Sequence, residues 1–254
     1  MIPVAALPRV RDLLRAAPDG PVPVVHAGEL AIYVEVSGRC VGVLAAGAAR
    51  VPCGMRSSLN HLQSLLSTSR PPTAYLGGGT LHVGSRSLPV GRTEGSYVPR
   101  IHPGVVRSTE TSPVTLQATP PATVAGLVAV LLPHGRIDAD TAPRLVGRGE
   151  GLTPLGDDLL AGWLALHRAA GVPTDAVDDV VRRQLSRTTL LSATLLDCAM
   201  HGEVLPEYAD WLRALDTPDE PARAAALSAV GATSGAGLLH GARLALRQLQ
   251  GVPA

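Results

Sequence analysis

The segment GRGEGLTPLGDDLLAGWLALH, residues 147–167, runs from a glycine-rich stretch directly into an apolar helical pattern. Leucines and Trp163 recur at helical spacing after Pro154, and Gly171 follows as a stop signal. Thr153 suits the N-cap, and Pro154 suits the first helical position. The segment therefore predicts a long helix that is entered through a glycine loop.

The sequence that follows this segment keeps the helical period. Apolar residues recur every three or four positions, and glycines or prolines separate the runs. Further helices are predicted at residues 174–184, 188–201, 207–215, 221–230 and 234–249. The second half is therefore predicted to be helical.

The sequence before residue 120 has a different pattern. Short apolar runs such as residues 31–36 alternate in the two-residue period of strands, and Gly, Pro and Ser separate them. The connections at residues 37–39 and 77–79 suit hairpin turns. These features predict a small β-sandwich or barrel.

Together the two patterns predict an α+β protein. We expect a β-rich domain at residues 1–118, followed by an α-helical domain at residues 119–254 that carries the glycine-rich loop. Residues 111–124 contain three prolines and are the predicted linker.

Composition excludes several classes of function. The formal net charge is +1 over 254 residues, so no strong field gathers nucleic acid or an anionic membrane. The sequence contains no Lys, which excludes a lysine Schiff base and a P-loop lysine. The longest apolar run, residues 122–133, is too short to span a bilayer. The N-terminus lacks a signal-peptide pattern, so we expect a soluble cytoplasmic protein without nucleic-acid or membrane partners.

The glycine loop has the features of an anion site. Alternating glycines permit left-handed backbone angles, so successive N–H groups can turn toward one concavity. The following helix start adds free N–H groups and the positive end of the dipole. Arg148 can add a bidentate contact and Thr153 a hydroxyl. The predicted anion-binding residues here are Gly147, Arg148, Gly149, Gly151, Thr153 and Gly156.

The adjacent Asp157 and Asp158 have two interpretations. As acidic residues in the first helical turn, they complement the helix dipole without any ligand. As a functional pair, they orient a substrate in catalysis or bind a hard cation such as Mg²⁺. Because no third ligand is evident, we rank the metal interpretation below the structural one.

An internal echo of this segment lies near the C-terminus. Residues 156–162, GDDLLAG, recur in outline as residues 235–241, GAGLLHG. The two stretches are interpreted as equivalent helix N-termini that face a shared pocket, which adds Thr233, Ser234 and Gly235 to the predicted anion site. Ser192 is added as well, because its hydroxyl and that of Thr188 lie one helical turn apart. The competing interpretation is that these hydroxyls bond back to helix carbonyls.

Other polar residues receive structural interpretations. His167, His201 and His240 are interpreted as residues of helix faces or C-termini, since no metal-binding spacing links them. Asp178 and Asp179 precede Arg182 and Arg183 by four residues, which predicts solvent-facing ion pairs.

The motif GRGEGLTPLGDDLLAGWLALH resembles the hallmark of the AllH-like family, the subunit type associated with oxamate carbamoyltransferase in allantoin degradation. Residues 187–204 and 230–246 are similar to two further stretches of that family. The resemblance covers the second half of the chain. One departure is Gly237, where analogy with Asp158 predicts an Asp.

The resemblance implies a subunit of a carbamoyltransferase that acts on a small anionic metabolite, oxamate or a similar molecule, together with other protein subunits. It places the chain in purine and allantoin catabolism. The alternative is a non-catalytic metabolite-binding or scaffolding subunit whose chemistry lies in partner chains. The substitution at Gly237 and the lack of a convincing nucleophile favour that alternative.

Overall fold

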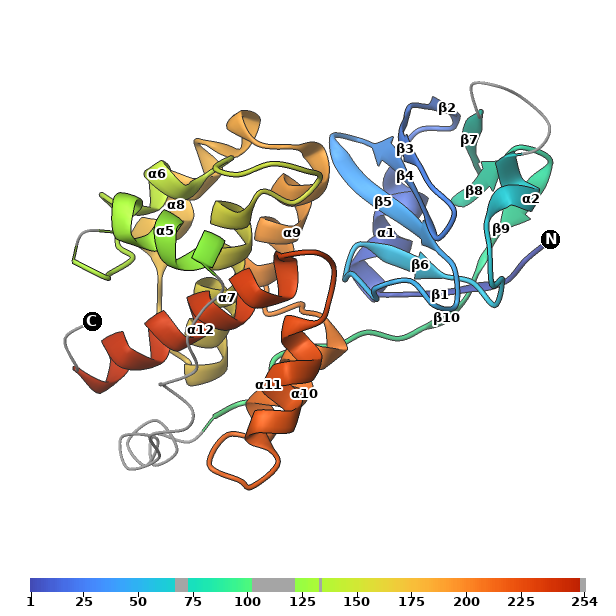
Figure 1. Cartoon of the computed structure of the whole chain (residues 1–254). Coiled ribbons are helices and arrows are strands. Elements are labelled where there is room, and N and C mark those ends of the chain that lie inside the picture. Colours follow the sequence, from blue (N-terminus) through green and yellow to red (C-terminus); the bar gives the residue numbers. More distant parts are fainter. Residues whose placement is uncertain (67–72, 102–121, 133, 252–254) are drawn as a thin grey trace. The chain divides into compact units, whose positions relative to one another are not determined.

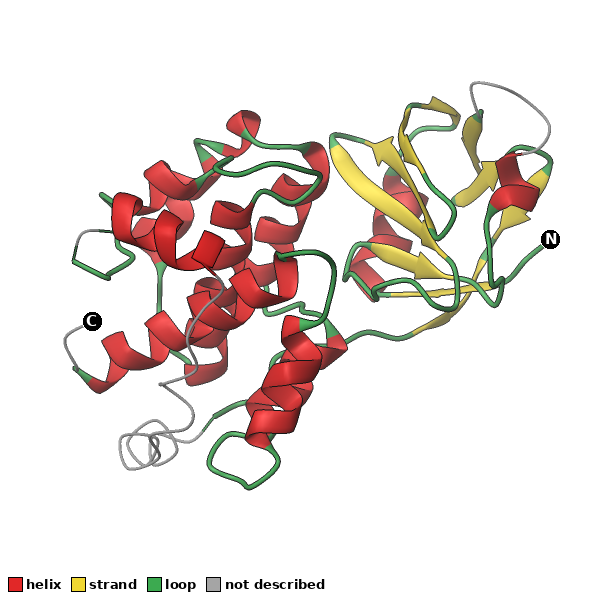
Figure 2. Cartoon of the chain, in the orientation of Figure 1, coloured by secondary structure: helices red, strands yellow, loops and turns green. Residues whose placement is uncertain are grey.

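The structure, a computed structural model, describes residues 1–66, 73–101, 122–132 and 134–251. The chain divides into two compact units, Met1–Gly95 and Ser96–Ala254. The first consists mainly of strands and the second of helices (Figures 1 and 2), so the α+β class is confirmed. The predicted domain boundary between residues 118 and 119, and most of the predicted linker, lie outside the described residues.

The first unit contains two sheets within its described residues. One sheet has six strands in the order β10-β1-β6-β5-β4-β3, and the other has four in the order β2-β7-β8-β9. Neither order closes on itself, so both sheets are open. The elements are β1 Val4–Ala6, α1 Pro8–Ala16, β2 Gly20–Val22, β3 Val24–Ala27, β4 Ala31–Val36, β5 Arg39–Leu44, β6 Gly54–Arg56, α2 Gln63–Leu66, β7 Ala74–Gly77, β8 Thr80–Val83, β9 Arg86–Leu88 and β10 Val90–Thr93.

Both sheets contribute to one hydrophobic core. Val34 and Val43 come from the larger sheet, Leu76 and Leu81 from the smaller one, and Leu14 from α1, and all are buried together. Burial of each such side chain contributes roughly 1.5–3 kcal/mol. Two open sheets that share a core correspond to the sandwich alternative of the prediction.

The two predicted hairpin turns are confirmed. β4 and β5 pair up to Val36 and Arg39, and the turn residues Ser37 and Gly38 have φ of 48° and 74°. Gly78 and Gly79 join β7 to β8 with φ of 54° and 71°. Positive φ at both central residues gives the turn that matches strand twist.

The helical unit is built around one buried helix. Its elements are α5 Ala122–Leu131, α6 Ala142–Leu145, α7 Leu155–Ala170, α8 Asp175–Arg182, the short 3₁₀ helix η1 Leu185–Arg187, α9 Leu190–Met200, α10 Pro206–Arg213, α11 Glu220–Ser228 and α12 Ser234–Gln250. Every predicted helix is present with small shifts at its ends, whereas α5 and α6 were not predicted. Nearly all of α7 is buried, and α12 and α9 pack against it. Among the described residues, no helix is long and apolar enough to cross a membrane.

The predicted capping role of Thr153 is wrong. The N-cap position of α7 is Pro154, whose ψ of 137° places the helix start one residue later, and no side chain caps it. Thr153 therefore lies outside the helix and pairs with the hydroxyl of Ser234 at 2.7 Å. The C-terminal prediction is confirmed, because Gly171 ends α7 with φ of 68°.

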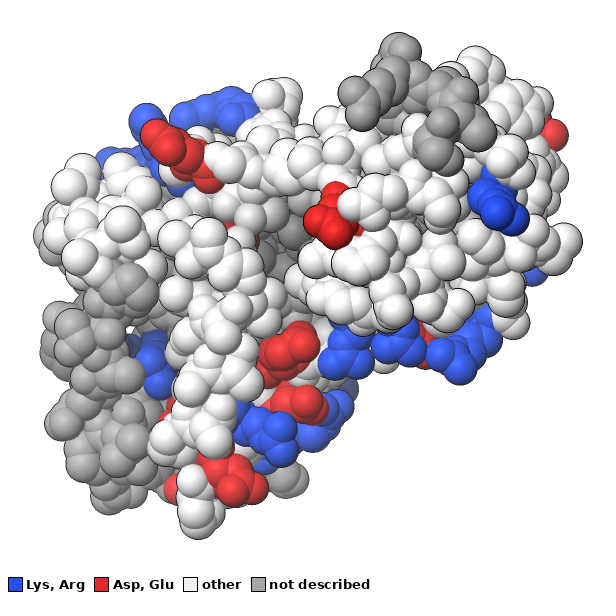
Figure 3. Space-filling view, turned by 45° about the vertical axis from the view of Figure 1, so that its right-hand side comes forward, with Lys and Arg blue, Asp and Glu red and all other residues white. Residues whose placement is uncertain are grey.

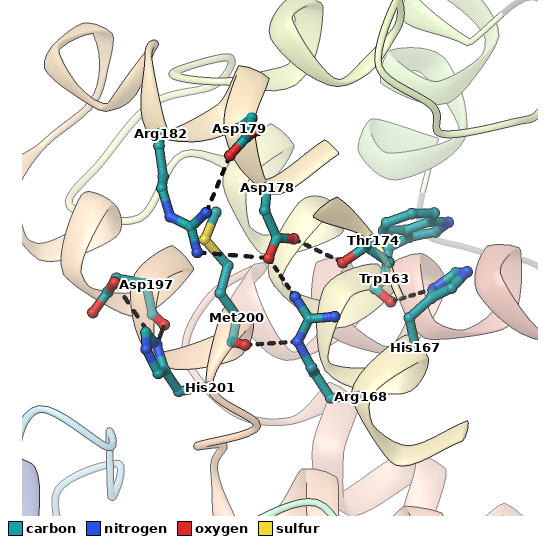
Figure 4. A network of polar contacts seen from close by, with 10 residues as sticks. All are labelled: Trp163, His167, Arg168, Thr174, Asp178, Asp179, Arg182, Asp197, Met200 and His201. Carbon is teal, nitrogen blue, oxygen red and sulfur yellow. Dashed lines mark hydrogen bonds and ion pairs between the residues drawn. The ribbon is translucent and has the colours of Figure 1, made fainter. Parts of the chain in front are cut away.

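The predicted solvent exposure of Asp178 is also wrong. Its side chain is buried, accepts a hydrogen bond from Thr174 Oγ1 at 2.7 Å and forms an ion pair with Arg168 (Figure 4). Arg168 Nε also donates to the carbonyl of Met200 at 2.6 Å. This network joins the ends of α7 and α9 to α8. Arg182 pairs with the buried Asp178 at 3.6 Å and with the exposed Asp179 at 3.4 Å, so the predicted pair of Asp178 with Arg182 is present. The four-residue spacing did not reveal that α7 supplies a second arginine.

Candidate functional site

The glycine loop, residues 147–154, has an alternating backbone. Gly147, Gly149 and Gly151 have φ of 72°, 118° and 90°, whereas Arg148 and Glu150 between them do not have positive φ. Such alternation turns successive N–H groups toward one side, as in anion-binding nests. Residues 148–152 are exposed to solvent.

Two of the loop's seven amides, and the amide of Gly156 at the helix start, are already used by the protein. Gly147 N–H donates to Asp157 Oδ1 at 2.8 Å, Arg148 N–H to the carbonyl of Leu145 at 3.0 Å, and Gly156 N–H to the carbonyl of Arg148 at 2.7 Å. The N–H groups of residues 149–153 have no partner among the described residues. We call these the open amides, and they confine any anion site to the middle of the loop.

Four of the five predicted anion-binding glycines have a packing role. A Cβ would overlap the carbonyl of Arg187 at Gly147, that of Leu145 at Gly156 and that of Leu227 at Gly235, and at Gly149 it would lie 2.7 Å from the backbone nitrogen of Leu155. Close backbone approach explains these four glycines without a ligand. Gly151 differs, because a Cβ there would meet nothing within 4 Å, and only its φ requires glycine.

Asp157 connects the loop to the start of α9. Its Oδ1 accepts from Gly147, and its Oδ2 accepts from Ser192 Oγ at 2.7 Å and from Thr188 Oγ1. Thr188 precedes α9 in an extended conformation, so the predicted shared helix face is wrong, yet both hydroxyls reach the same carboxylate. Burial raises the pKa of Asp157, and the three donors oppose that shift.

Asp158 lies in a different environment. Its side chain is buried, and its Oδ2 has no hydrogen-bond partner among the described residues. Burial raises its pKa well above the usual range, the hydroxyl of Ser234 lowers it, and the charge of Asp157 raises it further. These effects favour the neutral acid, which can donate a hydrogen bond.

The second glycine stretch lies beside the first. Thr153 and Ser234, at the entrances of α7 and α12, are joined by the 2.7 Å contact between their hydroxyls. Further along, Trp163 Nε1 donates to Gln248 Oε1 at 2.6 Å. The contacts follow the same order in both helices, so α7 and α12 run in the same direction from one end of the unit. The predicted pairing of two helix N-termini agrees with this geometry.

The echo in the sequence corresponds to reciprocal packing. A Cβ at Gly162 would overlap the carbonyl of Leu238, and a Cβ at Gly241 would overlap the carbonyl of Leu159. These are equivalent positions of the two stretches. Asp158 and Gly237 are a further pair of equivalent positions. A Cβ at Gly237 would lie 2.8 Å from the Cβ of Asp158. The absence of a second Asp at position 237 therefore has a packing reason.

Arg148 is the exposed cation of the loop. Its Nε donates to the carbonyl of Arg144 at 3.3 Å, and no carboxylate among the described residues forms an ion pair with it. Figure 3 shows basic side chains beside an acidic group at the upper left of the helical unit, while much of the face shown is uncharged. A guanidinium next to the open amides adds to their attraction for an anion.

Thr189 contacts the glycine loop but was not among the residues predicted from the sequence. Its hydroxyl caps α9 by accepting the N–H of Ser192 at 3.1 Å, and it donates to the carbonyl of Leu152 at 2.5 Å. The signal was present, since a Thr directly before an apolar helical run is an N-cap pattern. Its contact with the glycine loop needed the tertiary structure.

Metal binding has no support in this geometry. The oxygens of Asp157 are occupied by protein donors, and no group of three or more His, Cys, Asp or Glu side chains in the described part of the chain is arranged to bind a metal ion.

Comparison with known proteins gives one family match. Residues 145–246 match the family model of the oxamate carbamoyltransferase subunit AllH, which covers less than half of the 254-residue chain. The matched region begins before the glycine loop and ends within α12, so it includes both helix N-termini. Searches of curated proteins and of solved structures found no match. Over residues 145–246 this chain is thus similar to the AllH family of oxamate carbamoyltransferase subunits, which confirms the resemblance predicted from the motif.

Proposed function

We propose that this chain is a subunit of a carbamoyltransferase-type enzyme and that its glycine loop binds a small anionic metabolite, oxamate or a similar molecule. The observation that carries the proposal is the row of open amides at residues 149–153, exposed to solvent at the start of α7. Backbone N–H groups at a helix start attract negative charge without a cationic side chain. The family match over the same residues supports oxamate or a similar small anion as the proposed ligand.

The loop has the groups needed to hold such a ligand. The open amides and Arg148 bind a carboxylate, while Thr153 and Ser234 present hydroxyls from the two helix entrances. Thr233 and Gly235 flank that second entrance. Asp158, as a neutral acid, is the carboxyl that orients an amide or amine group of the ligand.

Carbamoyl transfer forms a bond from the acceptor nitrogen to the carbamoyl carbon and breaks the bond to the leaving group. Negative charge develops on the carbonyl oxygen during this step. N–H groups held by the fold stabilise that charge without having to reorient. We propose that the carbamoyl group passes directly from its bound donor to the bound acceptor, and that the other protein subunits complete the site.

The test is oxamate binding to the full chain, measured by calorimetry. Arg148→Ala is expected to weaken binding about tenfold, because loss of a charged hydrogen bond costs roughly 1.5 kcal/mol or more. Arg213→Ala is the matched control, since Arg213 is exposed on α10 and pairs with Asp210 at 2.8 Å. Equal affinity in both variants would contradict the proposed site.

A second pair of variants tests the backbone. Gly151→Ala and Gly171→Ala each place a side chain at positive φ with open space around it, at opposite ends of α7. Only Gly151→Ala is expected to weaken oxamate binding, because only its amide belongs to the open set. Affinity that is unchanged by Gly151→Ala would remove the loop from the binding site.

The alternative is a non-catalytic metabolite-binding or scaffolding subunit. The saturation of Asp157 by three protein donors favours it, since that carboxylate is not available to a substrate. Assays of carbamoyl transfer with oxamate and carbamoyl phosphate, on the chain alone and with its partner subunits, separate the two. In the assembled enzyme, Asp158→Asn lowers kcat if the chain is catalytic and leaves kcat unchanged if it is a scaffold.

A further inference from the structure

The glycine loop is held at both ends by the segment that leads into α9. At one end, Gly147 N–H and the hydroxyls of Thr188 and Ser192 meet on Asp157. At the other end, Thr189 Oγ1 donates to the carbonyl of Leu152. The open amides lie between these two attachments.

We propose that Asp157 is a positioning residue, which holds the open amides in their ligand-binding arrangement by tying Gly147 to Thr188 and Ser192, and which does not itself touch the ligand. The inference rests on the proposed function only for the identity of the ligand. The hydrogen bonds that support it join residues of this chain only.

The chemistry of Asp157 fits this role better than a helix-dipole role. Its donors are the N–H of a loop residue ten positions earlier and two hydroxyls from another segment, whereas a dipole explanation needs only nearness to the first turn of α7. An ionised carboxylate can accept from all three donors at once, because it has about four lone-pair sites. An Asn offers one accepting oxygen, so its amide nitrogen would have to donate to Thr188 and Ser192, whose hydroxyls would have to reorient to accept.

Burial supports the same role. Asp157 is 1% exposed, and its oxygens face protein donors rather than solvent. A buried acceptor with several donors fixes the relative position of the segments that supply them. Shifts of about 1 Å in such a frame can change function on the order of a hundredfold.

The experiment uses the full chain with ¹⁵N-labelled glycine, because Gly147, Gly149 and Gly151 then report on the loop directly. Amide hydrogen exchange is measured without ligand, and oxamate affinity is measured by titration. Asp157→Ala is expected to speed exchange at Gly147 and to weaken oxamate binding on the order of tenfold to a hundredfold. If Asp157→Ala does not fold, Asp157→Asn replaces it, with the same direction of change.

Asp178→Ala is the matched control. It also truncates a buried aspartate with an Arg partner and a Thr partner, but on α8 and away from the loop. It is expected to lower stability while leaving loop exchange and oxamate affinity unchanged. If Asp178→Ala changed both to the extent that Asp157→Ala does, the effect would be general destabilisation and the proposal would be overturned.

Ser192→Ala decides whether Asp157 positions the loop or contacts the ligand. Removal of this hydroxyl frees a lone pair on the carboxylate but weakens the tie to α9. A positioning role predicts weaker oxamate binding, whereas direct contact predicts equal or stronger binding and would overturn the proposal. If the unmodified chain binds no oxamate, the proposed function fails, and the exchange rates of the ligand-free variants still decide the role of Asp157.

Discussion

The N-termini of α7 and α12 have the same packing but a different chemistry. Gly162 and Gly241 each make room for a backbone carbonyl of the other helix, so the two stretches share one geometric function. Where α7 has two aspartates, α12 has Ala236 and Gly237. The repeated pattern in the sequence therefore encodes the contact between the two helices, whereas the aspartates are present in α7 only.

There is a physical reason why only α7 has an aspartate at this contact. Asp158 and Gly237 occupy equivalent positions that face each other, and a side chain at 237 would press on the Cβ of Asp158. Two buried carboxyls at this contact would also repel one another when ionised. One acid and one glycine is therefore the combination that fits.

The largest expected effect tests the shared packing. Gly162→Ala or Gly241→Ala forces the two backbones apart and is expected to cost about 3 kcal/mol or more in the free energy of unfolding, measured by chemical denaturation. Gly126→Ala in α5 is the control, since nothing lies near its Cβ and it should gain roughly 0.5–1 kcal/mol. A loss below about 1 kcal/mol at Gly162 would contradict the reciprocal contact.

A smaller effect is expected where the two stretches differ. Gly237→Ala brings a Cβ to 2.8 Å from Asp158 Cβ, which the backbone of α7 holds in place, and to 2.9 Å from Leu155 Cδ1, which can move by side-chain rotation, and it meets no carbonyl closer than 3.5 Å. We expect a loss of about 1–2 kcal/mol. Combined with Asp158→Gly in a double-mutant cycle, the coupling should reach at least about 0.5 kcal/mol. Simple additivity of the two losses would remove the packing reason for Gly237.

The smallest expected effect concerns His240, in the second of the two repeated stretches. Burial, with Arg247 and Arg243 nearby, lowers the pKa of His240 from 6.5 to about 4. The folded chain then binds fewer protons than the unfolded chain between these values, so stability falls as the pH drops from about 6.5 to about 4. After a discount for partial exposure, the loss is on the order of 1 kcal/mol. His240→Gln should reduce this loss in denaturation curves recorded across that window, and an unchanged curve would show that other groups cause it.

Much of the fold followed from local patterns. The hairpins at Ser37 and at Gly78 were predictable because glycine and small polar residues adopt the positive φ that those turns require. The helices from α7 to α12 were predictable because their apolar residues recur at helical spacing and glycines or prolines end them. α6 was missed because four residues carry too little periodic signal.

The candidate site was predictable only in part. The motif indicated the loop, its glycines and both aspartates as candidates, because free N–H groups and the helix dipole at a helix start favour an anion. It did not distinguish Asp157 from Asp158, which are neighbours in sequence. Their difference arises from Thr188 and Ser192 on one side and Gly237 on the other, all brought in from distant parts of the chain.

Local sequence patterns were enough to locate the two hairpins, the helices from α7 to α12 and the glycine loop, and to identify the family that residues 145–246 resemble. Tertiary contacts saturate Asp157 with protein donors. Within the described part of the chain, they leave one oxygen of Asp158 and the five amides of residues 149–153 without a partner. The physical reason is that backbone preferences act over a few residues. Burial and hydrogen bonding depend instead on residues as far as 111 positions apart, which only the folded chain brings together.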